Sequence, residues 1–312
     1  MNIDDIKRVL VLGAGTMGHQ IGLLCAIHGC QVVIHDKCPE IFDEAKRRLD
    51  RLADECIGKG LLSSGKKMET VGRISFCSDP EEAARDIDLV SESVPEDPAI
   101  KARVFGTFNS LCPERTLFTT NTSSLIPSMF AEATGRPEKF LAFHFHDILA
   151  TNVVDIMPHP RTAKETIDLV DAFARKLGQV VIMVEKESSG YVFNAMLGSL
   201  IDTALSLVSR KVACMEDVDR AWMGVMHTPL GPFGIMDSIG LDTVWKVMDF
   251  RARRANDRQL QASADFLNTF VSRGKLGKKS REGFYRYPEP LFSQKGFVAA
   301  RPETTIGDGS KS

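Results

Sequence analysis

The sequence predicts an α/β fold in the first part of the chain, followed by an all-helical C-terminal domain. An apolar run, Val9–Leu12, leads into the turn Gly13-Ala14-Gly15-Thr16-Met17-Gly18. A strand, a turn with glycines at this spacing and a helix are typical of dinucleotide-binding sheets. Strand-like apolar runs then alternate with helical segments up to about residue 187, and only helical segments follow. This alternation favours a doubly wound parallel sheet of the Rossmann type.

The first domain is expected to span residues 1–187. Its strands are expected at 9–12, 31–35, 74–76, 88–94, 117–121, 140–146, 153–157 and 179–184, and helices at 16–28, 39–59 and 98–111. A charged helical stretch begins at residue 39, and a lysine-bearing turn follows it. Together they are longer than an ordinary connection between two parallel strands. We therefore expect a helical arm near 39–70.

The second domain is expected at 188–288, with helices at 191–209, 215–225, 232–250 and 257–272. Helices with apolar faces often pair with a second copy, so we expect this domain to form a homodimer. We also assign substrate binding to it, which rests on the family resemblance described below. Residues 289–312 mix Pro, Gly, Ser and charge and offer little to bury, so this tail is expected to be poorly ordered.

Composition excludes several classes of function. The 39 basic and 41 acidic side chains give a net charge of −2, which provides no basic field for nucleic acid or an anionic membrane. No apolar run is long enough to span a bilayer, and the first residues do not resemble a signal peptide, so we expect a cytoplasmic protein. The seven cysteines show no Cys-x-x-Cys spacing, which argues against disulfides and structural zinc.

The glycine turn also predicts the cofactor. Phosphate groups bind to the free N–H groups at the start of the helix that follows such a turn. The second strand ends at Asp36, where a carboxylate accepts hydrogen bonds from the adenosine ribose and repels a 2′-phosphate. The pattern therefore favours NAD over NADP.

A candidate proton acceptor lies in the second half of the sheet. Oxidation of an alcohol by a nicotinamide leaves a hydroxyl proton, and histidine titrates in the range needed to accept it. His144 ends an apolar strand, Asn121-Thr122-Ser123-Ser124 follows the preceding strand, and Asp155 lies on the next one. A hydroxyl, an imidazole and a carboxylate are thus expected to converge. A metal cluster of His144, His146 and Asp147 is the alternative, but the proposed chemistry needs no metal.

Several motifs together resemble the L-3-hydroxyacyl-CoA dehydrogenase family over about residues 5–288. Besides the glycine turn they are Ser93-Val94-Pro95-Glu96 with Lys101, Asn121-Thr122-Ser123-Ser124-Leu125, His144-Phe145, Ser188-Ser189-Gly190-Tyr191-Val192-Phe193-Asn194, Gly231-Pro232-Phe233 and Gly283-Phe284-Tyr285.

The resemblance implies a role for each matching residue. His144 is the general acid/base, Asp155 orients it and stabilises its imidazolium form, and Ser123 and Asn194 contact the substrate. The expected cofactor-binding residues are Gly13, Gly15, Thr16, Met17, Gly18, Asp36, Glu96, Lys101 and Asn121. Ser63, Lys66 and Lys67 on the arm occupy the place where the family contacts the CoA nucleotide, although they also suit a solvated turn.

The sequence departs from the family pattern beside the base. His146-Asp147-Ile148-Leu149-Ala150 stands where the family reads Phe-Asn-Pro-x-Pro, so this loop is expected to be remodelled. Asp155 replaces the glutamate of the family, and it lies one residue closer to His144 in the sequence than that glutamate does. Ser189 replaces a proline and Ala195 replaces an arginine near the domain boundary.

The sequence thus predicts a reversible NAD-dependent dehydrogenase of fatty acid metabolism that oxidises short-chain L-3-hydroxyacyl-CoA. Asp155-Ile156-Met157-Pro158-His159-Pro160 also resembles the L-gulonate 3-dehydrogenase and lambda-crystallin-like branch. A dehydrogenase of free 3-hydroxy acids such as L-gulonate or L-carnitine therefore stays open. A non-enzymatic NAD-binding protein is the third alternative.

Overall fold

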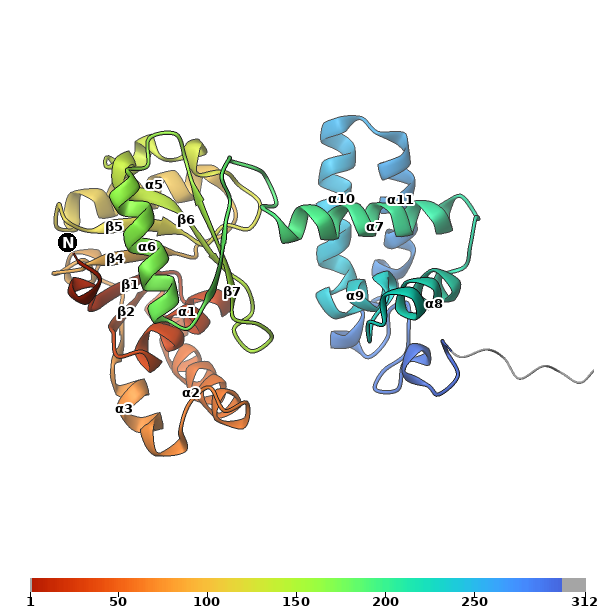
Figure 1. Ribbon diagram of the computed structural model, residues 1–312, viewed down its shortest axis with the longest axis horizontal. Helices are drawn as coiled ribbons and strands as arrows, with labels where there is room; N and C mark the ends of the chain where they lie inside the picture. The colour runs from red at the N-terminus through yellow and green to blue at the C-terminus, as the bar shows by residue number, and fades with distance from the viewer. Residues whose placement is uncertain (1, 299–312) are drawn as a thin grey trace, which may run out of the picture. The chain divides into compact units, whose positions relative to one another are not determined.

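The computed structural model describes residues 2–298 and divides into two compact units, Met1–Ala195 and Met196–Ser312 (Figure 1). The larger part of the tail expected at 289–312 lies outside the described residues. Its first residues are described: Phe297 is buried and packs under the guanidinium of Arg220.

The first unit contains a sheet of eight strands within the described residues. The strands are β1 Arg8–Leu12, β2 Gln31–His35, β3 Ile74–Cys77, β4 Leu89–Glu92, β5 Leu117–Thr120, β6 Phe140–Phe145, β7 Val153–Pro158 and β8 Val180–Met183. Their order is β3-β2-β1-β4-β5-β6-β7-β8. The predicted Rossmann-type sheet followed by helices is confirmed.

The expected parallel pairing holds for all neighbours except β6 and β7, which are antiparallel. A parallel return needs a crossover of a dozen or more residues, usually with a helix. Residues 146–152 are too few for one, so the chain turns back directly. This hairpin sets His144 and Asp155 opposite each other as register partners.

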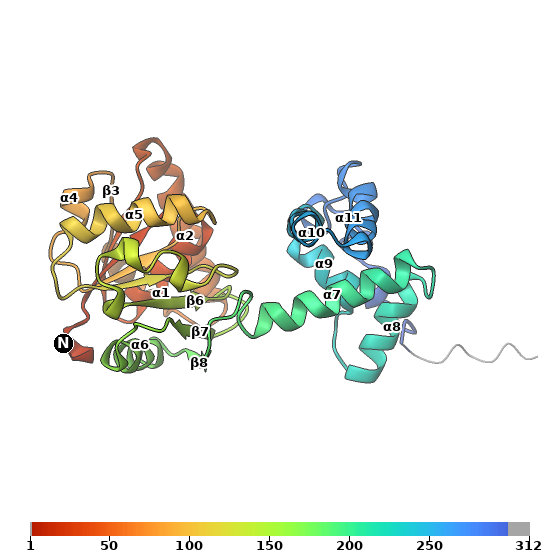
Figure 2. The same ribbon diagram turned by 90° about the horizontal axis from the view of Figure 1, so that it is seen from above.

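Helices cover both faces of the sheet because both faces are apolar. On one side, Val9 and Val11 of β1 join a core with α1 Thr16–Ile27, α2 Phe42–Gly58 and α6 Lys164–Lys176. On the other side, Leu10 and Leu12 join α4 Pro80–Ala83 and α5 Pro98–Leu111. Figure 2 shows α5 and α6 on opposite sides of the sheet. Alternate residues of one strand thus bury against two layers, as expected for a doubly wound sheet.

The helical arm expected near 39–70 consists of α2 and α3 Lys67–Gly72. A short 3₁₀ turn, Pro39–Ile41, precedes α2. Ala45, Leu49, Ala53 and Cys56 recur at helical spacing and are buried in the core that α1 shares. The apolar stripe of α2 therefore packs on the first unit, and its charged face stays exposed.

The second unit is helical, as predicted. After α7 Phe193–Ser209, which begins in the first unit, come α8 Met215–Met226, α9 Pro232–Ile239, α10 Leu241–Ala255 and α11 Arg258–Val271. The single helix expected over 232–250 is wrong, because Gly240 adopts φ +103° and separates α9 from α10. This backbone conformation lies outside the helical region and favours glycine.

Two buried carboxylates organise the second unit. Asp219 accepts hydrogen bonds from the N–H groups of Phe233 and Gly234, at the start of α9. Asp237 accepts from the N–H groups of Phe284 and Tyr285. Both carboxyl groups accept hydrogen bonds from backbone donors, which satisfies them in the apolar interior.

No helix in residues 2–298 combines the length and the hydropathy needed to cross a membrane.

Candidate active site

The glycine turn between β1 and α1 fits a pyrophosphate. Gly13 has φ +110°, and a Cβ there would lie 2.7 Å from the Ser93 carbonyl oxygen. A Cβ at Gly18 would clash with the Gly13 carbonyl. Within the described part of the chain, a Cβ at Gly15 would instead meet nothing within 4 Å, and no side chain caps the start of α1. A phosphate requires open space beside uncapped backbone N–H groups, and the first residues of α1, Thr16 and Met17, supply such groups here.

Asp36 follows β2 and lies next to this turn. Its Oδ2 accepts a hydrogen bond from the Ala14 N–H at 3.1 Å, and its Oδ1 accepts from the Cys38 N–H at 3.2 Å. These contacts hold the carboxylate at the position where the sequence predicts the ribose of NAD.

Replacing Asp36 by Ala is expected to weaken NAD binding by about 10- to 100-fold, the effect of losing hydrogen bonds to a charged group. The preference for NAD over NADP should narrow because the negative charge that repels a 2′-phosphate is gone. Fluorescence titration with both cofactors measures this. Asp43→Ala, on the exposed face of α2, is the matched control. Equal use of both cofactors by the unmodified protein would contradict the assignment.

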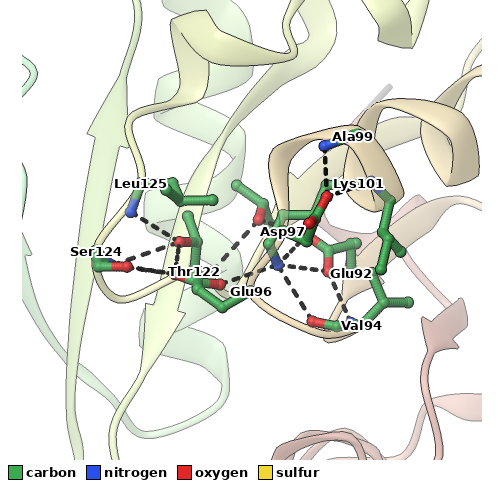
Figure 3. A network of polar contacts seen from close by, with 11 residues as sticks. Glu92, Val94, Glu96, Asp97, Ala99, Lys101, Thr122, Ser124 and Leu125 are labelled. Atoms are coloured by element: carbon green, nitrogen blue, oxygen red, sulfur yellow. Dashed lines mark hydrogen bonds and ion pairs between the residues drawn. The ribbon is translucent and has the colours of Figure 1, made fainter. Parts of the chain in front are cut away.

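Lys101 anchors a buried polar network between β4, α5 and β5 (Figure 3). Its Nζ donates to both carboxylate oxygens of Glu92, at 2.8 and 3.0 Å, and contacts Glu96 Oε2 at 3.2 Å. Glu92 also accepts from Thr120 Oγ1 at 2.6 Å and from the Val94 N–H at 2.7 Å. Sequence reasoning missed Glu92, although a carboxylate at the end of an apolar strand was a signal.

Glu96 forms hydrogen bonds with residues of the loop that follows β5. Besides Lys101, it accepts hydrogen bonds from the hydroxyls of Thr122 and Ser124. Burial alone would raise the pKa of Glu96, but the Lys101 ammonium and the two hydroxyls outweigh burial and lower it. Glu96 is therefore a carboxylate at neutral pH and fixes the Asn121–Leu125 loop.

Asn121 joins this loop to the next strand. Its Oδ1 accepts a hydrogen bond from the Phe145 N–H at 2.7 Å, directly after His144. Asn194 Nδ2 lies 3.5 Å from the Ser123 carbonyl oxygen, so the two expected substrate contacts are neighbours. Across the part of the chain that the structure describes, no hydrogen bond joins the Ser123 hydroxyl to His144.

His144 and Asp155 form a buried pair. His144 is 5% exposed and Asp155 is 1% exposed, and His144 Nδ1 lies 2.9 Å from Asp155 Oδ2. The antiparallel register places them opposite each other, which offsets the shorter side chain of aspartate. Burial alone would raise the pKa of Asp155, but the hydrogen bonds with His144 and His146 lower it. The carboxylate is therefore charged at neutral pH.

His146 contacts the same carboxylate, which the sequence did not predict. Its Nε2 lies 3.1 Å from Asp155 Oδ2, and its ring centroid lies 4.6 Å from that of His144. The two histidines are two residues apart in an extended segment, so their side chains lie on the same face of the sheet. Asp147, which the sequence grouped with them, is exposed, and its Oδ1 accepts from the Leu149 N–H.

Aromatic rings hold both imidazoles. The Tyr191 ring centroid lies 5.1 Å from that of His144, and the Phe193 centroid lies 5.6 Å from that of His146. Burial raises the pKa of Tyr191 well above its usual range, so the hydroxyl is neutral. Within residues 2–298 this buried hydroxyl has no hydrogen-bond partner. The sequence indicates Tyr191 only as part of the motif Ser188–Asn194.

The arm residues Ser63, Lys66 and Lys67 differ in their surroundings. Lys67 Nζ lies 2.8 Å from Asp50 and 2.7 Å from Asp54 of α2, and these carboxylates raise its pKa. Its charge is thus matched within the arm. Ser63 and Lys66 are exposed at the turn before α3. Among the described residues no hydrogen bond or ion pair connects the three to His144 or Ser123.

Comparison with known proteins matches both units. Models of the 3-hydroxyacyl-CoA dehydrogenase NAD binding domain and C-terminal domain match residues 8–188 and 190–287. A probable 3-hydroxybutyryl-CoA dehydrogenase of Bacillus subtilis is 32% identical over 286 residues, which cover 91% of this chain and 99% of that protein.

Two solved structures extend the similarity. A diketoreductase aligns with a TM-score of 0.85 and 35% identity, covering 90% of this chain and 99% of its own. The (S)-3-hydroxybutyryl-CoA dehydrogenase of Ralstonia eutropha aligns with a TM-score of 0.80 and 28% identity, covering 91% and 100%. The chain therefore belongs to the 3-hydroxyacyl-CoA dehydrogenase family, with an NAD-binding domain followed by the helical C-terminal domain.

Proposed function

We propose that this protein oxidises short-chain L-3-hydroxyacyl-CoA reversibly to 3-ketoacyl-CoA with NAD. The buried His144–Asp155 pair carries the proposal, because it supplies a charged partner for a base on the same sheet as the glycine turn. The Bacillus and Ralstonia relatives named as 3-hydroxybutyryl-CoA dehydrogenases support the substrate class.

The hydrogen bond to Asp155 selects the working nitrogen of His144. A carboxylate only accepts, so Nδ1 carries the proton that it receives and Nε2 keeps a free lone pair. Nε2 then takes the proton of the substrate hydroxyl while the C–H bond at carbon 3 breaks. Asp155 stabilises the imidazolium that results, as the aspartate of a serine-protease triad does. NAD, when bound, supplies the acceptor for the hydride.

Ser123 and Asn194 position the substrate in this proposal. The Ser123 hydroxyl donates to the substrate oxygen, and the Asn194 amide, whose Nδ2 lies 3.5 Å from the Ser123 carbonyl oxygen, hydrogen-bonds near the substrate carbonyl. Both act through fixed orientation, because proton transfer needs the hydroxyl within hydrogen-bond reach of the base.

One observation keeps free hydroxy acids as the second candidate. Lys67, one of two arm lysines expected to meet CoA phosphates, is already paired with Asp50 and Asp54. A substrate without CoA needs no cation there. Lys66, exposed and one residue away, remains the stronger candidate for a CoA phosphate.

The test is a substrate panel with NAD: 3-hydroxybutyryl-CoA, longer 3-hydroxyacyl-CoA thioesters, L-gulonate and L-carnitine. We expect the highest kcat/KM for 3-hydroxybutyryl-CoA. A higher kcat/KM for either free acid would replace the proposal with the second candidate. NAD binding with no turnover of any substrate would favour the non-enzymatic alternative.

The helical unit is proposed to form a homodimer. Val225 and Met226 of α8 and Val247 and Phe250 of α10 are large apolar side chains that are more than half exposed in one copy. Apolar side chains on helices of one unit favour burial against a second copy.

A further inference from the structure

His146 gives the proposed base a second neighbour that a simple His–Asp pair does not need. His144 Nδ1 and His146 Nε2 both point to Asp155 Oδ2, at 2.9 and 3.1 Å. The three donor atoms lie within 4.8 Å of one another, and all three side chains are mostly buried. We infer that His144, His146 and Asp155 bind a divalent transition-metal ion such as Zn²⁺, which inhibits the enzyme reversibly.

The donor set suits such an ion. Two imidazoles and a carboxylate are ligands that zinc prefers, with bonds of about 2.0–2.2 Å. In a tetrahedral site, ligand atoms then stand about 3.4 Å apart. The two N···O separations are a few tenths of an ångström shorter than this, because protons bridge these atoms. The two imidazole nitrogens lie within 4.8 Å of each other. A metal ion that replaces both bridging protons must therefore draw the two rings together by up to about 1.4 Å.

The surroundings favour fixed ligands over mobile ones. Strands β6 and β7 hold the backbones of His144 and Asp155, and the rings of Tyr191 and Phe193 contact the two imidazoles. Ligands already held in place lose little conformational entropy when the ion binds. The fourth position is left for water, as in a site with three protein ligands.

Inhibition follows from the tautomer of His144. A metal ion on Nδ1 occupies the lone pair of that nitrogen, so the single proton of the neutral imidazole is displaced from Nδ1 and is carried on Nε2 after exchange with solvent. Nε2 then has no lone pair to accept the hydroxyl proton of the substrate. The ion thereby stops turnover from the side of the ring away from the substrate, and the glycine turn and Asp36 stay free to bind NAD.

Binding and inhibition are tested separately, because only inhibition rests on the proposed function. Chelator-treated protein is titrated with Co²⁺ and followed by visible absorption, and with Zn²⁺ by calorimetry. We expect one ion per chain and the intense visible bands of a four-coordinate site. In activity assays Zn²⁺ should lower kcat, and a chelator should restore it.

His146→Gln should raise both the dissociation constant and the half-inhibiting concentration of Zn²⁺ by at least about tenfold, since even an outer-shell partner contributes 10- to 100-fold. His227→Asn and Cys214→Ser, which remove exposed surface ligands, should leave both values unchanged. Unchanged binding in His146→Gln, or loss of binding in Cys214→Ser, would overturn the site. The unmodified protein could also bind Co²⁺ but turn over no substrate. If His146→Gln then loses Co²⁺ binding, the site is supported and the proposed function is rejected.

Discussion

Replacing His144 by Gln is expected to lower kcat for 3-hydroxybutyryl-CoA oxidation by roughly 10²–10⁴, the usual contribution of general acid–base catalysis. Gln keeps a polar group near Asp155 but cannot take a proton at neutral pH. NAD affinity should stay nearly unchanged, because the glycine turn follows β1 and Asp36 follows β2, whereas His144 lies on β6. Steady-state kinetics and fluorescence titration with NAD separate the two effects.

The matched control is His159→Gln. His159 is also a buried histidine near a strand end of the same sheet, but its Nε2 hydrogen-bonds the Pro137 carbonyl oxygen. Among residues 2–298 it forms no ion pair with a carboxylate. We expect turnover close to that of the unmodified protein, with thermal unfolding measured to verify the fold. If His144→Gln turned over substrate as fast as the unmodified protein, the proton acceptor would lie elsewhere. His146, the other imidazole on Asp155, would then be the next residue to replace.

The sheet and its glycine turn could be predicted because their signals are local. Apolar runs such as Val9–Leu12 and glycines at fixed spacing depend on neighbouring residues only. The break at Gly240 was missed because the pattern on both sides is helical, and a single glycine does not by itself end a helix. The reversed direction of β7 was missed because the strand pattern of Val153–Met157 is the same in either orientation.

The site was predictable only in part, for a related reason. The motifs indicated His144 and Asp155, but the distance between them depends on the register of two strands. The contact of His146 with Asp155 comes from the same register. From the sequence alone Asp147 was the nearer carboxylate, yet it points to the loop backbone. The contact between Glu92 of β4 and Lys101 of α5, nine residues apart, likewise depends on how the helix packs beside the strand.

The arm shows how the surroundings change the meaning of a residue. From the sequence alone, Ser63, Lys66 and Lys67 are equally good candidates for contact with the CoA nucleotide. The structure distinguishes them, because α2 brings Asp50 and Asp54 to Lys67. Exposed pairs of this kind contribute little to stability. Their consequence is that Lys67 offers less uncompensated charge to an anionic substrate than Lys66 does.

Asp155→Asn is expected to lower turnover by at least about tenfold and by up to roughly 10⁴, the loss seen when a triad histidine takes the wrong tautomer. It should also move the pH profile of oxidation to lower pH. The lowered pKa of Asp155 keeps its carboxylate charged throughout the neutral range, so the profile there does not report this group. The carboxylate stabilises the cation that the base becomes when it takes the hydroxyl proton, and the neutral amide of Asn lacks the charge to do so.

The pH dependence of kcat and of kcat/KM measures this shift, and its sign distinguishes a charge effect from a loss of packing. Asp147→Asn removes the same charge three residues after His144, on an exposed side chain that, among the described residues, has no hydrogen bond or ion pair with either histidine. Its profile should therefore be unchanged. A structural role alone would lower the activity of Asp155→Asn at every pH without moving the profile. A profile that keeps its position, with turnover intact, would remove Asp155 from the mechanism and leave His144 acting as a base without a charged partner.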